Sequence, residues 1–404
     1  MNHKRQIKQG IRANANQFFL LVLTNALVGG MLGMERTVVP VMAQQSFELH
    51  HRTTILSFIM VFGLSKAVSN YLAGGYSGRW GRKRLLVLGW LFGLPVPLLL
   101  MWAPSWGWVL VANALLGIHQ GFAWSSTVIM KIDLAGPGQR GLATGINEFA
   151  GYIAIGLTAY WTGLLADVHG IRPYPFYVGL GLAIAGLALS LFLVRDTSHF
   201  LSLESDTAPR RGMPATIPDT ARTNQVLWTV TQAGFINNLN DGVIWGLLPI
   251  FLLRQELTLE RIGLVVALYP AVWGFGQLFA GRLGDLLSIK ALLVGGMLIQ
   301  AVALFGFTQT SQWPGLLTAS AALGFGTALV YPNFLTAIAN VLKPHRRSAG
   351  IGIFRFWRDL GYAAGALLAG VMADRFNPAA SLTGIAALTL LSALILKWYF
   401  PPRI

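Results

Sequence analysis

The sequence predicts an all-α membrane protein with twelve transmembrane helices, arranged as two pseudo-symmetric six-helix bundles. Composition is the first reason: 54% of the 404 residues are apolar and 11% are charged, against about 25% charged in soluble proteins. The second reason is an internal repeat, because residues of the first half recur 207 positions later without a gap. The matching pairs are Gly74 and Gly281, Lys83 and Lys290, Gly117 and Gly324, Pro137 and Pro344, Arg140 and Arg347, Gly145 and Gly352, Gly163 and Gly370, and Asp167 and Asp374. Two copies of one helical unit are therefore joined head to tail, an arrangement that places the substrate site of transporters between the copies.

Hydrophobic segments of about 20 residues, the length that crosses a bilayer, follow one another along the whole chain. They cover residues 17–43, 53–75, 84–102, 106–130, 141–165, 174–194, 226–252, 260–281, 291–309, 315–341, 349–373 and 380–400. A long polar stretch, rich in Ser, Asp, Pro and Arg, separates the sixth segment from the seventh. We therefore expect an N-terminal bundle at 1–194, a flexible cytoplasmic linker at 195–225 and a C-terminal bundle at 226–404.

The net charge of +15 indicates membrane topology rather than nucleic-acid binding. With the N-terminus inside, the cytoplasmic segments contain 21 of the 30 Lys and Arg residues and the external segments contain 5. The other four, Arg36, Lys66, Arg355 and Arg358, lie within predicted helices. The positive-inside rule then places both termini in the cytoplasm. We expect a monomeric, multi-pass protein in the lipid bilayer of a bacterial inner membrane, with no nucleic-acid partner.

The sequence lacks the residues that several kinds of chemistry require. There is no cysteine, which excludes disulfides and thiolate chemistry. We find neither a phosphate-binding loop nor a His-Glu-x-x-His motif, so we expect no enzyme activity, no cofactor and no metal site. The first hydrophobic segment is too long for a signal-peptide core and contains Glu35 and Arg36, so we expect it to remain uncleaved.

A motif rich in glycine and arginine stands between the second and third hydrophobic segments. It reads Gly74-Gly75-Tyr76-Ser77-Gly78-Arg79-Trp80-Gly81-Arg82-Lys83-Arg84 and resembles the loop motif of the major facilitator superfamily, G-x-x-x-D-R-x-G-R-[RK]. Its glycines permit a tight turn, and its basic side chains can pair with carbonyls at a helix C-terminus. The candidate gating residues are Gly74, Arg79, Gly81, Arg82 and Lys83, with Gly281 and Asp285 in the second copy.

The resemblance covers essentially the whole chain. It implies the fold of that superfamily and secondary transport of a small molecule, in which the two halves rock about a central site. The chain is similar to bacterial drug or metabolite exporters, although the marks of individual subfamilies are mostly missing. One position departs from the motif: Gly78 stands where the family usually has Asp, while the second copy keeps Asp285. The usual charge-relay lock of the N-terminal half is therefore in question.

Ionisable residues within the predicted helices mark the candidate site. Each charge at mid-bilayer costs about 2.5–3.5 kcal/mol on insertion scales, so such a residue should face a cavity or a partner. These residues are Glu35, Glu148, Asp241, Asp359, Arg36, Lys66, Arg355, Arg358 and His119. Helical spacing places Arg355, Arg358, Asp359 and Tyr362 on one face of the eleventh helix.

Two further helices carry polar faces by the same spacing rule. Asn237, Asp241 and Trp245 form a stripe on the seventh helix, and Glu148 shares a face with Tyr152 on the fifth. Since the offset of 207 sets Glu148 opposite Arg355 in the second copy, equivalent positions carry opposite charges.

An ion pair between Lys66 and Asp359 is expected from the resemblance, because the second and eleventh helices are neighbours in that fold. Aromatic side chains serve mainly for packing, and of these we expect Trp245 and Tyr331 to stack on a ligand. A structural alternative stays open for several charged residues, either as ion pairs away from substrate or as core packing. It applies to Arg355 and Arg358 with Asp359, to Glu35 with Arg36, to Asp241, to Glu148 and to His119.

The leading hypothesis is proton-coupled export of a small organic compound by antiport. A carboxylate that is buried when the cavity closes binds a proton more readily, and Asp241, Glu148 and Glu35 are the candidates in that order. The alternative is uptake or exchange of an organic anion, which the four basic residues of the helices favour. An alternative of another class is a sensor or scaffold with the same fold that transports nothing.

Overall fold

The computed structural model describes residues 9–136, 139–200, 225–342 and 344–401, with the side chains of 74–79, 199, 281–282, 284–286 and 344–349 left aside. The described chain is almost entirely helical. Its elements are α1 (Ala15–Arg36), α2 (Val38–Gln45), α3 (Arg52–Trp80), α4 (Arg82–Gly93), α5 (Pro95–Trp102), α6 (Trp106–Ala135), α7 (Arg140–His169), α8 (Tyr174–Ala188), η2 (Leu189–Leu193), η3 (Ser198–Phe200), α11 (Gln225–Leu253), α12 (Leu259–Leu286), α13 (Ile289–Gln309), α14 (Trp313–Val341), α15 (Pro344–Arg375) and α16 (Pro378–Tyr399).

Ten helical stretches of the described chain are long and apolar enough to cross a membrane. α1 with α2 forms one of them, and α4 with α5 forms another. Helices α6 and α15 have 30 and 32 residues and are therefore also long enough, but α15 carries Arg355, Arg358 and Asp359 in its middle. The protein is a multi-pass membrane protein, and the full count of twelve spans stays a prediction.

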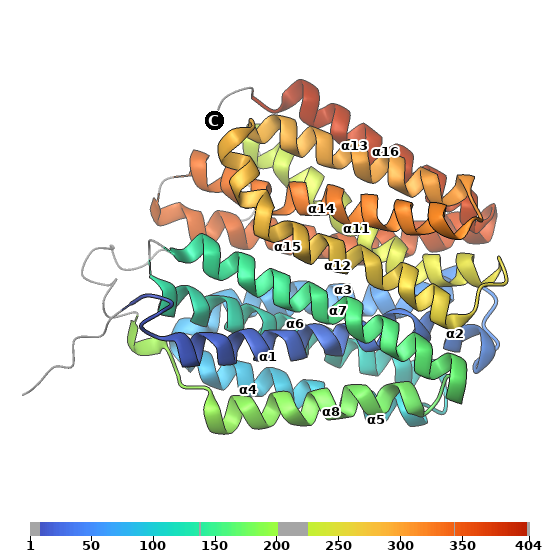
Figure 1. Ribbon diagram of the computed structural model, residues 1–404, viewed down its shortest axis with the longest axis horizontal. Coiled ribbons are helices and arrows are strands. Elements are labelled where there is room, and N and C mark those ends of the chain that lie inside the picture. The colour runs from blue at the N-terminus through green and yellow to red at the C-terminus, as the bar shows by residue number, and fades with distance from the viewer. Residues whose placement is uncertain (1–8, 137–138, 201–224, 343, 402–404) are drawn as a thin grey trace, which may run out of the picture.

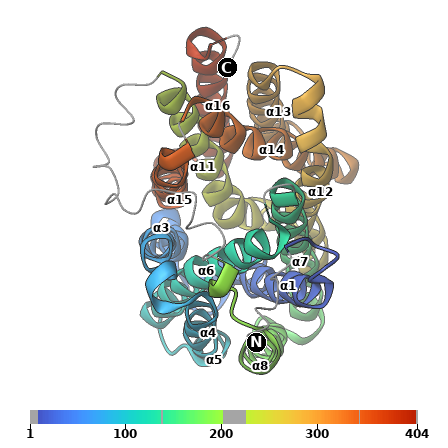
Figure 2. The same cartoon turned by 90° about the vertical axis from the view of Figure 1, so that its left-hand side faces the viewer.

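The helices lie side by side along the long axis of the molecule (Figure 1). Helices from the first half of the chain lie below those from the second half in this view, and Figure 2 shows the same grouping from one end. Helix α7 packs along α12, and α3 packs along α15. We call the end that holds Ala15 and Tyr399 the terminal end, and the opposite end, where α3 and α12 begin, the distal end.

The internal repeat of the sequence is also a repeat of packing. A Cβ atom on Gly117 of α6 would lie 2.6 Å from the carbonyl oxygen of Phe62 on α3. A Cβ atom on Gly324 of α14 would lie 2.4 Å from the carbonyl oxygen of Tyr269 on α12. Both glycines and both contact residues differ by the same offset of 207. Helices α3 and α6 therefore meet in the same way as α12 and α14, and in both places only glycine lets the backbones approach so closely.

Replacement of Gly324 by alanine is expected to lower the melting temperature of the purified protein by several degrees, because the added methyl group meets backbone atoms of α12. The matched control is Gly295→Ala on α13, where a Cβ atom would meet nothing within 4 Å. Alanine is favoured over glycine within a helix by about 1 kcal/mol, so this control should melt no lower than the parent. Equal melting temperatures for the two variants would show that the close approach is unimportant.

Two aspartates join the halves of the chain at the distal end, and we call them the distal caps. The Asp374 carboxylate, in the last turn of α15, accepts hydrogen bonds from the backbone N–H groups of Arg52 (2.5 Å) and Thr53 (2.9 Å) at the start of α3. The Asp167 carboxylate, near the end of α7, accepts one from the backbone N–H of Leu259 (3.0 Å) at the start of α12. A carboxylate satisfies free N–H groups and the positive end of a helix dipole. Each cap therefore fastens a helix of one half to a helix of the other.

The predicted gating motif contributes mainly to helix α3 rather than to a loop. α3 runs to Trp80 and the chain breaks at Gly81, whose φ of 83° favours glycine. As the sequence predicted, a basic side chain of the motif binds a carbonyl at a helix end: the Lys83 ammonium donates to the carbonyl oxygen of Leu191 (2.8 Å). The side chains of residues 74–79, 281–282 and 284–286 are outside the described part, so the predictions for Gly74, Arg79, Gly281 and Asp285 remain untested.

A second polar cluster lies beside Lys83, at the start of α4. Arg82 forms an ion pair with Asp133 near the end of α6, and the backbone N–H of Lys83 donates to Asp196 (2.9 Å). Burial alone would raise the pKa of Asp196, but hydrogen bonds from Ser198 and Lys83 and the nearby Arg82 charge outweigh it and lower that pKa. A lowered pKa means that this link stabilises the fold at neutral pH and is lost in acid.

Candidate functional site

A polar cavity lies between the two halves of the chain. It encloses about 480 Å³ of empty space, part of it open to solvent. Helices α1, α3, α6 and α7 supply its walls from the first half, and α14 and α15 supply them from the second. The lining residues are Leu32, Lys66, Asn70, Trp124, Ser125, Glu148, Tyr152, Ile155, Tyr331, Arg355, Arg358, Asp359 and Tyr362.

The cavity brings together positions that are equivalent in the two repeats. The paired lining positions are Trp124 and Tyr331, Glu148 and Arg355, Tyr152 and Asp359, and Ile155 and Tyr362. Glu148 and Arg355 thus face the same space with opposite charges, as the offset of 207 predicted. The repeat therefore places the cavity at the interface between its two copies.

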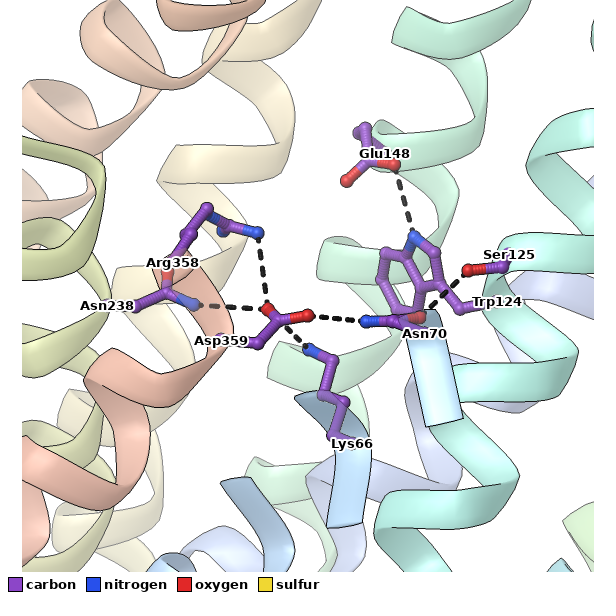
Figure 3. A network of polar contacts seen from close by, with 8 residues as sticks. All are labelled: Lys66, Asn70, Trp124, Ser125, Glu148, Asn238, Arg358 and Asp359. Atoms are coloured by element: carbon purple, nitrogen blue, oxygen red, sulfur yellow. Dashed lines mark hydrogen bonds and ion pairs between the residues drawn. The ribbon is translucent and has the colours of Figure 1, made fainter. Parts of the chain in front are cut away.

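The carboxylate of Asp359 is the centre of a network that crosses this interface (Figure 3). The Lys66 ammonium is 3.9 Å from Asp359 Oδ1, which confirms the predicted ion pair. The side-chain amides of Asn70 (2.5 Å) and Asn238 (3.4 Å) donate to the two carboxylate oxygens. Arg358 Nη1 also lies 3.8 Å from Oδ1. The Asp359 carboxylate is therefore contacted by side chains from α3, α11 and α15.

The carboxylate of Glu148 has neutral partners instead. Its Oε1 atom accepts hydrogen bonds from Trp124 Nε1 (3.1 Å) and from the side-chain amide of Asn147 (3.0 Å). Among the described residues no ion pair includes Glu148. One turn later on α7, the Tyr152 ring stacks on Trp273 of α12 at 3.6 Å between ring centres. Glu148 is thus a carboxylate in the cavity wall that is held by neutral hydrogen-bond donors and by no ion pair among the described residues.

Arg358 has more hydrogen-bond donors than partners. Its guanidinium group lies over the ring of Tyr331, 4.3 Å from the ring centre, and the residue is 5% exposed. Its Nε and Nη2 atoms are buried without a hydrogen-bond partner among the described residues. Buried donors in proteins are nearly always satisfied, and no described protein group satisfies these two nitrogens.

Glu35 and Arg36 lie beyond the cavity, toward the distal end. Arg36 is one helical turn past Leu32, which lines the cavity. Its guanidinium group is 3.4 Å from Glu35 and lies between the rings of Phe62 (4.9 Å) and Trp245 (4.4 Å). Glu35, Arg36, Phe62 and Trp245 are all fully buried. Arg36, Phe62 and Trp245 therefore form a buried, packed group on the distal side of Leu32, which we call the buried layer.

The polar stripe of α11 also lies outside the cavity lining. Asp241 accepts a hydrogen bond from the hydroxyl group of Tyr269, and Asn237 accepts one from the side-chain amide of Gln300 (3.0 Å). These partners come from α12 and α13, so Asn237 and Asp241 turn toward their own half of the chain, whereas Trp245 meets Arg36 of α1. The structure thus places Asn237, Asp241 and Trp245 in packing contacts next to the cavity rather than on its wall.

Two buried basic groups lie elsewhere than the sequence suggested. His119 does not line the cavity: its Nδ1 atom is 3.0 Å from the Gly89 carbonyl oxygen, and its ring packs against Trp90. This is the structural alternative foreseen for that histidine. Lys131, which is one of the 21 basic residues counted above in cytoplasmic segments, is fully buried in α6 and donates to the carbonyl oxygen of Leu21 (3.1 Å).

Sequence reasoning missed several lining residues as members of the site. They are Leu32, Asn70, Trp124, Ser125 and Ile155. Two signals were available in retrospect. Trp124 stands at the repeat-equivalent position of Tyr331, and Asn70 lies one turn after Lys66. The hydroxyl group of Ser125 donates to Asn70 Oδ1 (2.8 Å) and so extends the Asp359 network into α6.

Long membrane helices around a polar cavity, built from two copies of one unit, define a transporter rather than an enzyme. The chain belongs to the major facilitator superfamily: the family described as Major Facilitator Superfamily matches residues 18–233 and 230–404.

Among curated proteins the chain is similar to transporters of bacteria. It is 23% identical to the multidrug resistance protein MdtG of Citrobacter koseri over 385 residues, which cover 91% of each chain. It is 23% identical to the uncharacterized transporter BU588 of Buchnera aphidicola over 184 residues, and this match spans about half the length of each protein, 46% of this chain and 45% of that one.

Two solved structures share the fold over 95% of the chain. They are the human organic anion transporter MFSD10 (TETRAN), with a TM-score of 0.69 and 17% identity, and the xylose transporter XylE of E. coli in a partially occluded inward-open conformation, with a TM-score of 0.72 and 15% identity. The alignments cover 99% of the MFSD10 chain and 98% of the XylE chain.

Proposed function

We propose that the protein is a proton-coupled secondary transporter that works by alternating access. In this proposal twelve helices form two bundles, residues 1–194 and 226–404, joined by the linker at 195–225, of which 201–224 lie outside the described residues. The bundles rock about the cavity and expose it to one side of the membrane at a time. We place the protein as a monomer in a bacterial inner membrane, with the terminal end in the cytoplasm as the positive-inside rule predicts.

The observation that carries the proposal is the cavity itself, because it presents Glu148 and Arg355 from equivalent positions of the two repeats. The buried layer and the distal caps support a state that is closed at the distal end. Among the described residues, only side-chain packing and a few hydrogen bonds hold the two halves together at the distal end. Contacts of this kind can break and re-form, as a site that opens to each side of the membrane in turn requires.

Glu148 is our first candidate for the coupling residue, because it lines the cavity and forms no ion pair among the described residues. When the site closes and loses water, the neutral carboxyl becomes favoured, and when it reopens the proton leaves. Asp241 and Glu35 rank second and third, since neither lines the cavity in this state. This order reverses the first two sequence candidates.

The substrate is a small organic compound, and export is the leading direction. The relatives named multidrug resistance proteins favour export. Uptake or exchange of an organic anion is the second candidate, favoured by Arg355 and Arg358 in the cavity wall. A sensor or scaffold without transport is the remaining class, and it predicts that the embedded acids can be amidated together with no loss of function.

The test is a transport assay with purified protein in liposomes. A thermal-shift screen of drugs and metabolites at two pH values first selects compounds that bind. Liposomes that contain one of these compounds and a pH-sensitive dye then report proton entry as the compound leaves. Acidification of the lumen that requires the compound supports the proposal. Saturable uptake of the compound that is insensitive to Asp241→Asn and to the pH gradient would favour the second candidate. If neither the compound nor protons cross the membrane, the proposal of transport is contradicted.

A further inference from the structure

We infer that the cavity recognises an organic anion, a carboxylate attached to a flat apolar body, and that Arg358 binds the carboxylate. This inference rests on the proposed function, since it takes the cavity as the substrate site. It names the chemical class of the substrate, which neither the fold nor the relatives determine.

The first argument is the unused hydrogen-bonding capacity of Arg358. A guanidinium group has five N–H donors. Its closest charged neighbour, Asp359, is 3.8 Å from Nη1, beyond hydrogen-bond distance. The Nε and Nη2 atoms are buried without a partner among the described residues. These nitrogens form one edge of the planar group, and that edge matches the two oxygens of a carboxylate.

The second argument is the balance of charge in the cavity wall. Lys66 and Asp359 form an ion pair, and Asp359 accepts two further hydrogen bonds from neutral amides. The carboxylate of Asp359 is therefore already satisfied. Among the described residues that line this cavity, Glu148 is the only other acid, and it shares the lining with Arg355 and Arg358. One positive charge is in excess, so an anion completes the cavity and a cation does not.

The third argument is the apolar surface beside the arginine. The rings of Trp124, Tyr152, Tyr331 and Tyr362 line the same cavity. Tyr152 is fixed by stacking on Trp273 and lies 5.5 Å from Trp124 between ring centres. Aromatic rings held in place by their neighbours suit the face of another flat apolar group.

The test compares three probes of one shape and different charge: 2-naphthoate, 2-naphthamide and 2-naphthylmethylammonium. Each is titrated by isothermal titration calorimetry into the full-length protein in detergent. We expect 2-naphthoate to bind roughly tenfold or more tightly than the other two, as charge-assisted hydrogen bonds imply. Equal affinities, tightest binding of the ammonium probe, or no binding of any probe would overturn the inference.

Variants of Arg358 test whether this residue binds the carboxylate. Arg358→Gln should reduce the affinity for 2-naphthoate to about that for 2-naphthamide. Arg358→Lys keeps the charge but loses the planar fork, so its affinity should be intermediate. The matched control is Arg375→Gln, an exposed arginine at the end of the same helix. A loss of 2-naphthoate affinity no greater for Arg358→Gln than for the control would reject Arg358 as the binding residue. If Arg358→Gln does not fold, the ranking of the probes on the parent protein still decides the inference.

Failure of this inference and failure of the proposed function are distinguishable. A parent protein that prefers the ammonium probe and still couples its exit to proton entry in liposomes refutes anion recognition alone. A parent protein that prefers 2-naphthoate but moves neither the probe nor protons refutes transport alone.

Discussion

Glu148→Gln is expected to reduce substrate-dependent proton entry into liposomes to the level of liposomes without protein. Glutamine keeps the size of the side chain and can still accept a hydrogen bond from Trp124 Nε1, as the carboxylate does. It cannot exchange a proton, so coupling should be lost while the protein stays folded. The measurement is dye fluorescence in the lumen, with the melting temperature as the test of folding.

Two controls make this result specific. Glu260→Gln removes an exposed carboxylate in the first turn of α12 and should leave proton entry unchanged. Asp241→Asn affects a carboxylate that binds Tyr269 outside the cavity lining and should reduce coupling less than Glu148→Gln does. Full proton coupling in the Glu148→Gln protein would remove Glu148 from the mechanism and make Asp241 the first candidate.

A disulfide across the distal end should block transport completely. The variant carries Thr53→Cys and Asp374→Cys, which replace two side chains that now bind each other through a hydrogen bond of 2.7 Å. Since the chain contains no cysteine, no other thiol competes. Oxidation would then join α3 to α15, and if the distal end must separate in each cycle, substrate movement in either direction should stop.

Reduction of that disulfide with dithiothreitol should restore transport, which separates the effect of the cross-link from the effect of the substitutions. The single variants Thr53→Cys and Asp374→Cys, treated with the same oxidant, should remain active. The second distal cap, Asp167 with Leu259, is intact in all of them. Normal transport by fully cross-linked protein would show that the distal end does not open, and alternating access about this cavity would fail.

The positions of most helices, and a polar cavity between the two repeats, could be predicted from the sequence. Helix ends follow from the boundaries between apolar and polar segments, so the segment predicted at 349–373 corresponds to α15 at Pro344–Arg375. The offset between Glu148 and Arg355 also predicted that these two residues face one space, and the structure places both on the cavity wall. A repeat predicts an interface because equivalent surfaces of two fused copies pack against each other.

The rotation of each helix about its axis could not be predicted in the same way. Spacing shows that Asn237, Asp241 and Trp245 share a face, but it does not show whether that face meets the cavity or a neighbouring helix. In the structure Tyr269 and Gln300 occupy that face. Lys131 shows the same limit, since it was counted with a cytoplasmic segment while its side chain is buried and donates to the carbonyl oxygen of Leu21.

The opposite charges of Glu148 and Arg355 have a consequence for how such a chain can arise. A homodimer of identical half-length subunits would set like residues against each other, either two carboxylates or two guanidinium groups. Gene fusion lets each copy mutate alone, so a dipole across the cavity becomes possible only after the duplication. A charge difference between equivalent positions therefore requires two copies that can differ in sequence.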